Sequence, residues 1–277
     1  MRRPRAGERA LRLSAAALAV VWSVFPIALV VMSSFRPQRD IFAIPPTLIF
    51  SPTLDNYERL LREWPAFLPN MLNSVIITAG ATIVTVSFST LAGYVYARFS
   101  GKTLALSAFF MVVVRMLPPI VVTLPLFPLF SWLGVNDTHL VLILLYAAFF
   151  VSLATWIMRA FIAQVPRELE EAAWVDGANL AQILRHVVLP LVLNGLVAAS
   201  LFVVVYAWNE FIFALVFTTR TARTTPLVMS EMLSTIDGVD WGVLFAAATL
   251  QLVPVLLFVL AAQKYIIAGL TAGAVKG

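Results

Sequence analysis

Apolar and polar stretches alternate along the chain on the length scale of a lipid bilayer. Runs with few or no charged residues cover positions 13–33, 71–97, 104–133, 140–158, 187–219 and 243–263. A helix needs about 20 consecutive apolar residues to cross the hydrocarbon core, within a range of about 17–25. The pattern therefore predicts an all-α polytopic membrane protein, with six transmembrane helices in a single domain over residues 1–277.

The third run differs from a plain span because Arg115 and Pro118-Pro119 interrupt it, and Pro125 and Pro128 follow. Proline removes a backbone donor and clashes with the preceding turn, so we expect this segment to break or bend. Arg115 lies one turn before the expected break. It either donates hydrogen bonds to carbonyl groups that the break frees, or contacts a hydroxylated solute.

The fifth run carries the second charge within a span, Glu210, next to Asn209. At 1.5 Å per residue, Arg115 and Glu210 lie roughly 16 Å and 30 Å along their segments from the cytoplasmic side, so we expect no direct ion pair. Two roles fit Glu210. It is either a neighbour of Trp208 in the outer membrane interface, or it joins Asn209 in lining a path or bonding a partner helix.

The polar stretch 165–190 begins with the pattern of an amphipathic helix. Pro166 suits the first helical position, and carboxylates suit the opening turns because of the helix dipole. The sequence predicts one apolar and one polar face. The apolar positions are Val165, Leu169, Ala172 and Ala173, and the polar positions are Arg167, Glu168, Glu170 and Glu171. We therefore expect Glu170 and Glu171 to be exposed.

A turn and a second helix complete this stretch. Asp176-Gly177 is a turn signal, and Asn179 with Gln182 three residues later has the spacing of a capping box. The second helix is predicted to begin near Leu180 and to end at Leu189-Pro190. Two short helices joined at a glycine are too polar to cross a bilayer and are suited to lie beneath one.

Composition and charge place the chain in the membrane. Hydrophobic residues make up 61% and charged residues 12% of the chain, against about 45–50% and 25% in soluble domains. Lys and Arg are enriched in cytoplasmic loops. With the N-terminus inside, twelve of them fall on the cytoplasmic side and six outside. Both termini, the basic tail 1–12 and the stretch 165–190 are therefore predicted to be cytoplasmic.

Two further segments follow from this orientation. The run 13–33 is longer than the 7–15-residue core of a signal peptide, so it is interpreted as the first span. Residues 35–70 are predicted to be an exported loop with a short helix around 56–63, because four arginines balance four acidic residues there.

Several kinds of chemistry find no support. Gly101-Lys102-Thr103 resembles the end of a phosphate loop, but that motif needs a glycine at position 96, which is Tyr96. His139 and His186 lack further ligands at metal-binding spacing. Neither a nucleophile elbow nor a HExxH helix occurs, and no basic stripe with interleaved aromatic residues supports nucleic-acid binding. We expect no metal site, no nucleic-acid partner and no enzyme activity.

Glu171-Ala172-Ala173, Gly177 and Leu189-Pro190 stand at the offsets of a known motif, with Val187 where isoleucine is common. The segment resembles the EAA loop of permease subunits of type I ABC importers. The resemblance implies a coupling helix that enters a groove on an ATPase subunit. The ATPase-coupling candidates are Glu170, Glu171, Ala172, Ala173, Asp176, Gly177, Leu189 and Pro190.

Shorter motifs extend the resemblance along the chain. They are Ser33-Ser34-Phe35-Arg36, Pro45-Pro46, Asn56-Tyr57, Asn73-Ser74, Trp208-Asn209-Glu210-Phe211 and the tail 269–277. Together they are similar to the smaller permease subunit of maltose-type carbohydrate importers.

The resemblance implies a permease subunit of an ATP-driven carbohydrate importer in a bacterial or archaeal inner membrane, forming half of the translocation path. The implied partners are a second permease subunit, two cytoplasmic ATPase subunits, which bind the ATP, and an extracytoplasmic sugar-binding protein. Arg115, Asn209 and Glu210 are candidates for the substrate path. The alternatives are an ion-coupled secondary transporter or channel subunit, and a type I permease for a non-sugar solute.

Overall fold

The computed structural model describes residues 6–45, 50–235 and 238–274, and its described segments are helices and connecting turns. The all-α prediction is confirmed. The chain divides into two compact units, Met1–Leu68 with Met229–Leu252, and Pro69–Val228 with Val253–Gly277. We call these unit 1 and unit 2. Arg2, Arg3, Arg5, Pro46 and the last three residues of the C-terminal motif lie outside the described residues.

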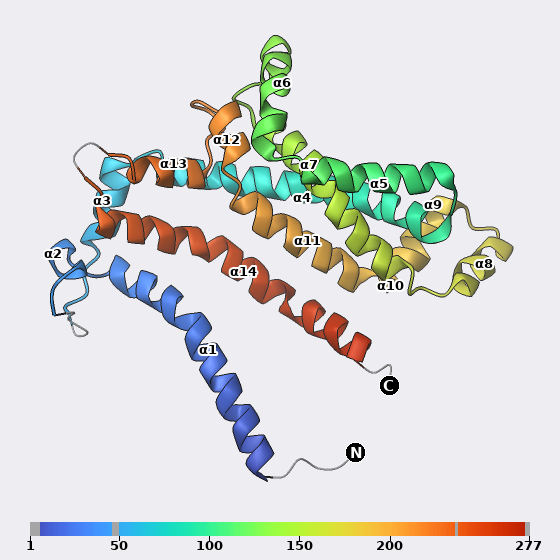
Figure 1. The fold of residues 1–277 in the computed structure, drawn as a ribbon, viewed down its shortest axis with the longest axis horizontal. Helices are drawn as coiled ribbons and strands as arrows, with labels where there is room; N and C mark the ends of the chain where they lie inside the picture. The colour runs from blue at the N-terminus through green and yellow to red at the C-terminus, as the bar shows by residue number, and fades with distance from the viewer. Residues whose placement is uncertain (1–5, 46–49, 236–237, 275–277) are drawn as a thin grey trace. The chain divides into compact units, whose positions relative to one another are not determined.

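Unit 1 contains α1 (Ala6–Ser34), α2 (Gln38–Ile41) and α3 (Asp55–Glu63), with parts of α13 (Thr225–Met232) and α14 (Trp241–Ala274) (Figure 1). Two of the short sequence motifs meet here. The buried Asn56 amide donates to the main-chain oxygens of Ser34 and Arg36, both at 2.8 Å. The Ser34 hydroxyl lies 2.7 Å from the Tyr57 hydroxyl. Asn56 and Tyr57 therefore fix the end of α1 to α3, and the predicted helix around 56–63 is confirmed.

Unit 2 is built on α4 (Phe67–Arg98), α7 (His139–Ile162) and α11 (Leu193–Trp208). α7 and α11 run alongside each other in Figure 1. Glycines allow the helices to approach closely. A Cβ atom at Gly93 of α4 would lie 2.8 Å from Cβ of Met158 and 2.9 Å from the main-chain nitrogen of Arg159, both on α7. At Gly195 of α11 it would lie 2.6 Å from the Phe161 ring. Close backbone approach through small residues is typical of helix packing in membranes.

The predicted break in the third apolar run is confirmed. It separates α5 (Lys102–Met116) from α6 (Pro119–Trp132), and the two helices are bent by 95°. Pro118 and Pro119 cannot donate main-chain hydrogen bonds, which ends the α5 ladder at this point. Pro125 and Pro128, in contrast, lie within α6.

The number of spans depends on how bent helices are counted. In the described part of the chain, four helices are long and apolar enough to cross a membrane, and two bent pairs would raise the number to six. The expected fifth span is not one straight helix. It bends by 80° at Val192, and a further break separates α11 from α12 (Ile212–Phe217).

Candidate functional site: the polar loop 165–190 and the intramembrane charges

The first helix of the polar loop is α8 (Arg167–Val175), with Pro166 at its N-cap position. Gly177 follows with φ +84°, a left-handed conformation that suits glycine. Its N–H bonds the Trp174 oxygen at 3.0 Å, and the Ala178 N–H bonds the Ala173 oxygen at 3.0 Å, which closes the helix C-terminus. The turn predicted at Asp176-Gly177 is confirmed.

The predicted capping box begins α9 (Leu180–Ile183). The Gln182 N–H donates to Asn179 Oδ1 at 3.0 Å, and the Asn179 N–H donates to Gln182 Oε1 at 2.8 Å. The expected end at Leu189-Pro190 is wrong. The helix continues through a π turn, η1 (Leu184–Val188), and α10 (Leu189–Leu191), because Pro190 occupies an early position of α10. The first turn of a helix needs no N–H donor there.

Glu170 is 5% exposed, so the prediction that it faces solvent is wrong. Its carboxylate accepts hydrogen bonds from Tyr94 Oη at 2.7 Å and Arg98 Nε at 2.8 Å, both from the end of α4. A buried carboxylate needs such partners, since an isolated one is costly to remove from water. A cationic partner thus turns a polar position into the buried face of α8.

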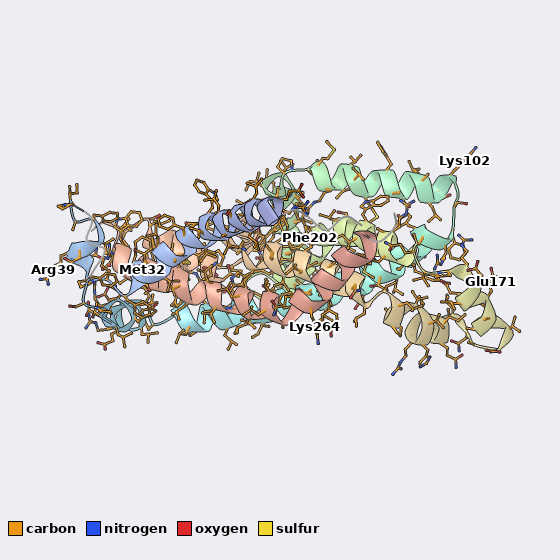
Figure 2. All side chains as sticks on the ribbon, turned by 90° about the horizontal axis from the view of Figure 1, so that it is seen from below. Met32, Arg39, Lys102, Glu171, Phe202 and Lys264 are labelled. Carbon is orange, nitrogen blue, oxygen red and sulfur yellow. The ribbon has the colours of Figure 1, made fainter. Side chains whose placement is uncertain are left out.

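The predicted apolar face of α8 is confirmed at two of its four positions and wrong at the other two. Val165, before the helix, is buried and Ala173 is half-buried, but Leu169 and Ala172 are exposed. Trp174 is 56% and Val175 87% exposed. Glu171 is exposed as predicted. It lies at the same end of unit 2 as Lys102, the first residue of α5 (Figure 2). α8 therefore presents a mixed apolar and acidic surface to solvent.

A crevice separates α8 from the second half of the loop. Its cavity volume is ≈ 350 Å³, and Ala173, Asp176, Gly177, Ile183 and Val187 are among its lining residues. Three of the residues predicted from the EAA pattern, Ala173, Asp176 and Gly177, thus line one crevice, and Ala172 immediately precedes them in the sequence. Leu189 and Pro190 lie further along, in α10.

Arg115 bonds a main-chain oxygen within unit 2. Its Nη1 donates to the oxygen of Phe149 on α7 at 3.1 Å, and its guanidinium lies over the Phe149 ring at 4.7 Å. The rings of Phe150 and Phe202 are within 6.0 Å. The acceptor is on a neighbouring helix, not a carbonyl freed by the α5–α6 break. Arg115 thereby joins α5 to α7 through a cation–π contact and a hydrogen bond.

Glu210 caps the helix that follows it. Its carboxylate oxygens accept from the N–H groups of Phe213 at 2.9 Å and Ala214 at 3.3 Å, at the start of α12. Asn209 is exposed and donates to the Val205 oxygen at 2.8 Å. Among the described residues no ion pair joins Glu210 to Arg115, as the sequence predicted. A carboxylate at a helix N-terminus satisfies otherwise unpaired donors.

Sequence reasoning missed the polar contacts at the opposite end of α4. The Asn73 amide donates to the main-chain oxygens of Thr221 at 2.8 Å and Arg223 at 3.1 Å. Its Oδ1 lies 2.8 Å from His139 Nε2. The Asp137 carboxylate accepts hydrogen bonds from main-chain N–H groups of the same loop, residues 219–222. The Asn73-Ser74 motif pointed to Asn73, but no sequence signal marked Asp137.

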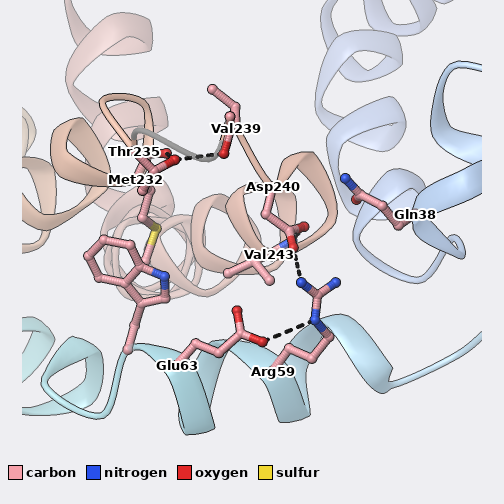
Figure 3. A pocket seen from close by; sticks show the side chains of 10 residues that line it. Gln38, Arg59, Glu63, Met232, Thr235, Val239, Asp240 and Val243 are labelled. Atoms are coloured by element: carbon pink, nitrogen blue, oxygen red, sulfur yellow. Dashed lines mark hydrogen bonds and ion pairs between the residues drawn. The ribbon is translucent and has the colours of Figure 1, made fainter.

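Unit 1 holds a polar pocket between α3 and the segment before α14 (Figure 3). Its cavity volume is ≈ 350 Å³. Arg59 pairs with Asp240 and, at 3.3 Å, with Glu63, while Trp64 and Met232 contribute apolar surface. Burial acts to lower the pKa of Arg59, but the carboxylates of Asp240 and Glu63 outweigh it and raise that pKa. Within the described residues, no cluster of three His, Cys, Asp or Glu side chains could hold a metal ion.

Comparison with known proteins identifies the family. Residues 86–271 match the family described as binding-protein-dependent transport system inner membrane component. The chain belongs to this family of membrane permeases. It is 35% identical over 275 residues to the trehalose/maltose transport system permease protein MalG of Thermococcus litoralis, covering 98% of both chains. It is 35% identical to the trehalose transport system permease protein SugB of Mycobacterium tuberculosis, over 94% of this chain and 95% of SugB.

Solved structures agree on the permease fold. A bacterial ABC transporter involved in the import of the acidic polysaccharide alginate matches with a TM-score of 0.74 at 19% identity. The match covers 96% of the present chain and 100% of the alginate transporter chain. The MetNI methionine ABC transporter matches with a TM-score of 0.59 at 18% identity, covering 75% and 97%. ABC importer permeases thus share this helical arrangement.

Proposed function

We propose that this permease is one of two transmembrane subunits of an ATP-driven carbohydrate importer. Relatives named for trehalose and maltose transport cover nearly the whole chain, which supports a sugar as the solute. The chain acts as one permease domain over residues 1–277 and forms half of the translocation path. ATP is hydrolysed by two separate cytoplasmic subunits, and this chain binds no cofactor. Six spans with both termini in the cytoplasm complete this arrangement.

The observation that carries the proposal is the exposed surface of the 165–190 loop. Leu169, Trp174 and Val175 are apolar side chains exposed to water, on a knob that also displays Glu171. Exposed apolar side chains rimmed by polar ones mark protein interaction sites. This knob is the coupling helix that enters a groove on an ATPase subunit, with Ala172, Ala173, Asp176 and Gly177 shaping it and Leu189-Pro190 joining it to the membrane. Glu170 contributes from the buried side.

The substrate path is proposed to run along the faces that carry Arg115, Asn209 and Glu210. Arg115 has aromatic neighbours, and Asn209 is exposed beside the α11–α12 break. Broken helices in membranes are tolerated where they line a cavity or are covered by protein. The pocket with Arg59 and Trp64 lies on the predicted exported side, where the sugar-binding protein would dock.

The test is reconstitution of the permease pair with its ATPase and binding protein in proteoliposomes. Uptake is measured for maltose, trehalose, an alginate oligosaccharide and methionine. We expect ATP-dependent uptake of one of the sugars by the full complex and none by this chain alone. Transport by the isolated chain, or uptake of methionine in place of every sugar, would count against the proposal.

The Glu171→Lys variant tests the coupling surface, because it reverses a charge at the expected groove. We expect the ATPase to co-purify in reduced amount and uptake to fall about tenfold or more, as for a lost contact to a charged group. Gln164→Lys is the control. It places a positive charge on an exposed residue just before the loop, and it should leave both quantities unchanged.

A further inference from the structure

The carboxylate of Glu170 is held by two residues of α4 that lie one turn apart. Arg98 approaches Oε1 with Nε at 2.8 Å and Nη2 at 2.6 Å, and Tyr94 Oη donates to Oε2 at 2.7 Å. The side chains of Arg98 and Glu170 are 8% and 7% exposed. Both carboxylate oxygens are therefore occupied from α4, in surroundings where the contact is screened little by solvent.

Main-chain contacts reinforce this link in both directions. Arg98 Nη2 also donates to the oxygen of Val165, just before α8, at 2.9 Å. Arg167 Nη2, from the first turn of α8, donates to the oxygen of Arg98 at 3.1 Å. We call the buried group Tyr94, Arg98 and Glu170 the α4–α8 clamp. It joins the first half of the coupling loop to the end of a helix 72 residues away.

The other connection of the loop is built differently. Between α9 and α11 the chain passes through the π turn Leu184–Val188 and then bends by 80° at Val192. Irregular turns of this kind interrupt the regular hydrogen-bond ladder and often mark functional hinges. α4 is itself closely packed on α7 at Gly93. The loop is thus fixed to α4 and α7 and connected to α11 by a bend.

We infer that Tyr94, Arg98 and Glu170 are positioning residues that make α4 and α7 follow the coupling loop, while α11 pivots at Val192. The inference rests on the proposed function, since it requires an ATPase that moves the loop. A buried ion pair contributes little to stability compared with apolar packing, but it fixes one geometry. Packed helix interfaces do not deform continuously when one side is displaced. We therefore expect a displacement of the loop to move α4 as a rigid body through the clamp.

Paired spin labels test the inference in the assembled complex, because the chain contains no cysteine. One pair, at Phe99 and Glu168, spans the clamp, and the other, at Glu168 and Tyr206, spans the bend. All three positions are exposed, and none belongs to the proposed ATPase-docking surface. On adding ATP with vanadate, we expect the first interlabel distance to stay constant and the second to change. A change across the clamp as large as that across the bend would overturn the inference.

Variants of the clamp give an independent test. The milder Tyr94→Phe should leave the ATPase bound and ATP hydrolysis present. Both Tyr94→Phe and Glu170→Gln should broaden the Phe99–Glu168 distance distribution and reduce the nucleotide-driven change of the second pair. The exchange Arg98→Glu with Glu170→Arg should restore part of the response. Lys102→Gln changes an exposed residue at the same end of unit 2 that takes no part in the link between α4 and α8, and it is the control. Should Tyr94→Phe and Glu170→Gln both keep the wild-type distributions, the clamp has no positioning role.

These outcomes are separable from failure of the proposed function. If no ATPase co-purifies with the wild-type permease pair, the proposed function is wrong and the clamp has no moving partner. If the wild-type complex assembles and hydrolyses ATP but the clamp variants respond normally, only the clamp inference fails.

Discussion

The carboxylate of Asp137 accepts a hydrogen bond from the main-chain N–H of Thr221, 84 residues further along the chain, at 3.0 Å. The N–H groups of Thr219, Arg220 and Ala222 point to the same carboxylate at 3.0–3.2 Å. One side chain thereby satisfies four consecutive donors of the loop after α12. Asp137 itself has φ +60° at the turn before α7, a conformation that Asp tolerates better than most residues.

We predict that Asp137→Asn lowers the thermal stability of the purified protein. Asparagine has one acceptor oxygen, and its amide would face N–H donors, so about 1–3 kcal/mol should be lost. Thermal unfolding in detergent at pH 7 measures the effect. Asp55→Asn, at an exposed aspartate in the first turn of α3, is the control and should change stability by less than about 0.5 kcal/mol.

The pH dependence of that difference follows from the pKa of Asp137. Burial acts to raise this pKa, but the N–H donors of the 219–222 segment outweigh it and hold the pKa well below its usual range. A depressed folded pKa gives stability that is complete above the unfolded value, about 3.9, and is lost only as pH falls toward the folded value. The difference in free energy of unfolding between the wild type and Asp137→Asn should stay constant between pH 8 and pH 5 and become smaller below about pH 4. Narrowing already between pH 7 and pH 5 would contradict this assignment.

A second stability prediction concerns Asn56, which is 1% exposed. Its amide donates to two carbonyl oxygens, so Asn56→Asp would set a carboxylate against acceptors and should cost about 3 kcal/mol or more. Asn179→Asp is the matched control, because Asn179 is exposed and its Oδ1 accepts from the Gln182 N–H, a role that a carboxylate keeps. Thermal unfolding of both variants should separate them clearly, and equal losses would argue against the Asn56 contacts.

Close helix packing gives a third prediction. Gly93→Ala places a methyl group against the Arg159 backbone, which cannot move without shifting α7. We expect a loss of about 1–3 kcal/mol, as for other overpacked interfaces. A Cβ atom at Gly7 has nothing within 4 Å, so Gly7→Ala should stay within about 0.5 kcal/mol. Chemical denaturation in mixed micelles compares the two, and an unaffected Gly93→Ala protein would show that α4 and α7 are less closely packed.

The helices, and the break at Pro118-Pro119, could be predicted because their causes are local. Apolar runs of bilayer length and prolines act on the residues next to them. The capping box at Asn179 and Gln182 and the turn at Gly177 were predictable for the same reason, since each satisfies its own backbone.

The environment of Glu170 could not be predicted, because its partners are 72 and 76 residues away on α4. Amphipathic analysis assigns a charged residue to the solvent face, whereas a buried cation can reverse that assignment. The same limit applies to Asp137, whose four donors belong to a loop 82–85 residues further along the chain. The chemistry of such sites depends on tertiary contacts that no spacing in the sequence records.

The fourth prediction separates an ATP-driven permease from an ion-coupled carrier through Glu210. Its two oxygens cap α12, and Glu210→Gln keeps one acceptor for this purpose, so the complex should retain most of its ATP-dependent uptake. Glu210→Leu removes both acceptors and should lower the free energy of unfolding by about 1–2 kcal/mol, the usual effect of losing a cap.

Uptake into proteoliposomes is measured with ATP, with and without a protonophore. An ion-coupled carrier would lose uptake in Glu210→Gln and with the protonophore, because an ionisable site within the span would carry the coupling ion. Persistence of uptake under both conditions, together with the loss of stability in Glu210→Leu, would assign the carboxylate to helix capping.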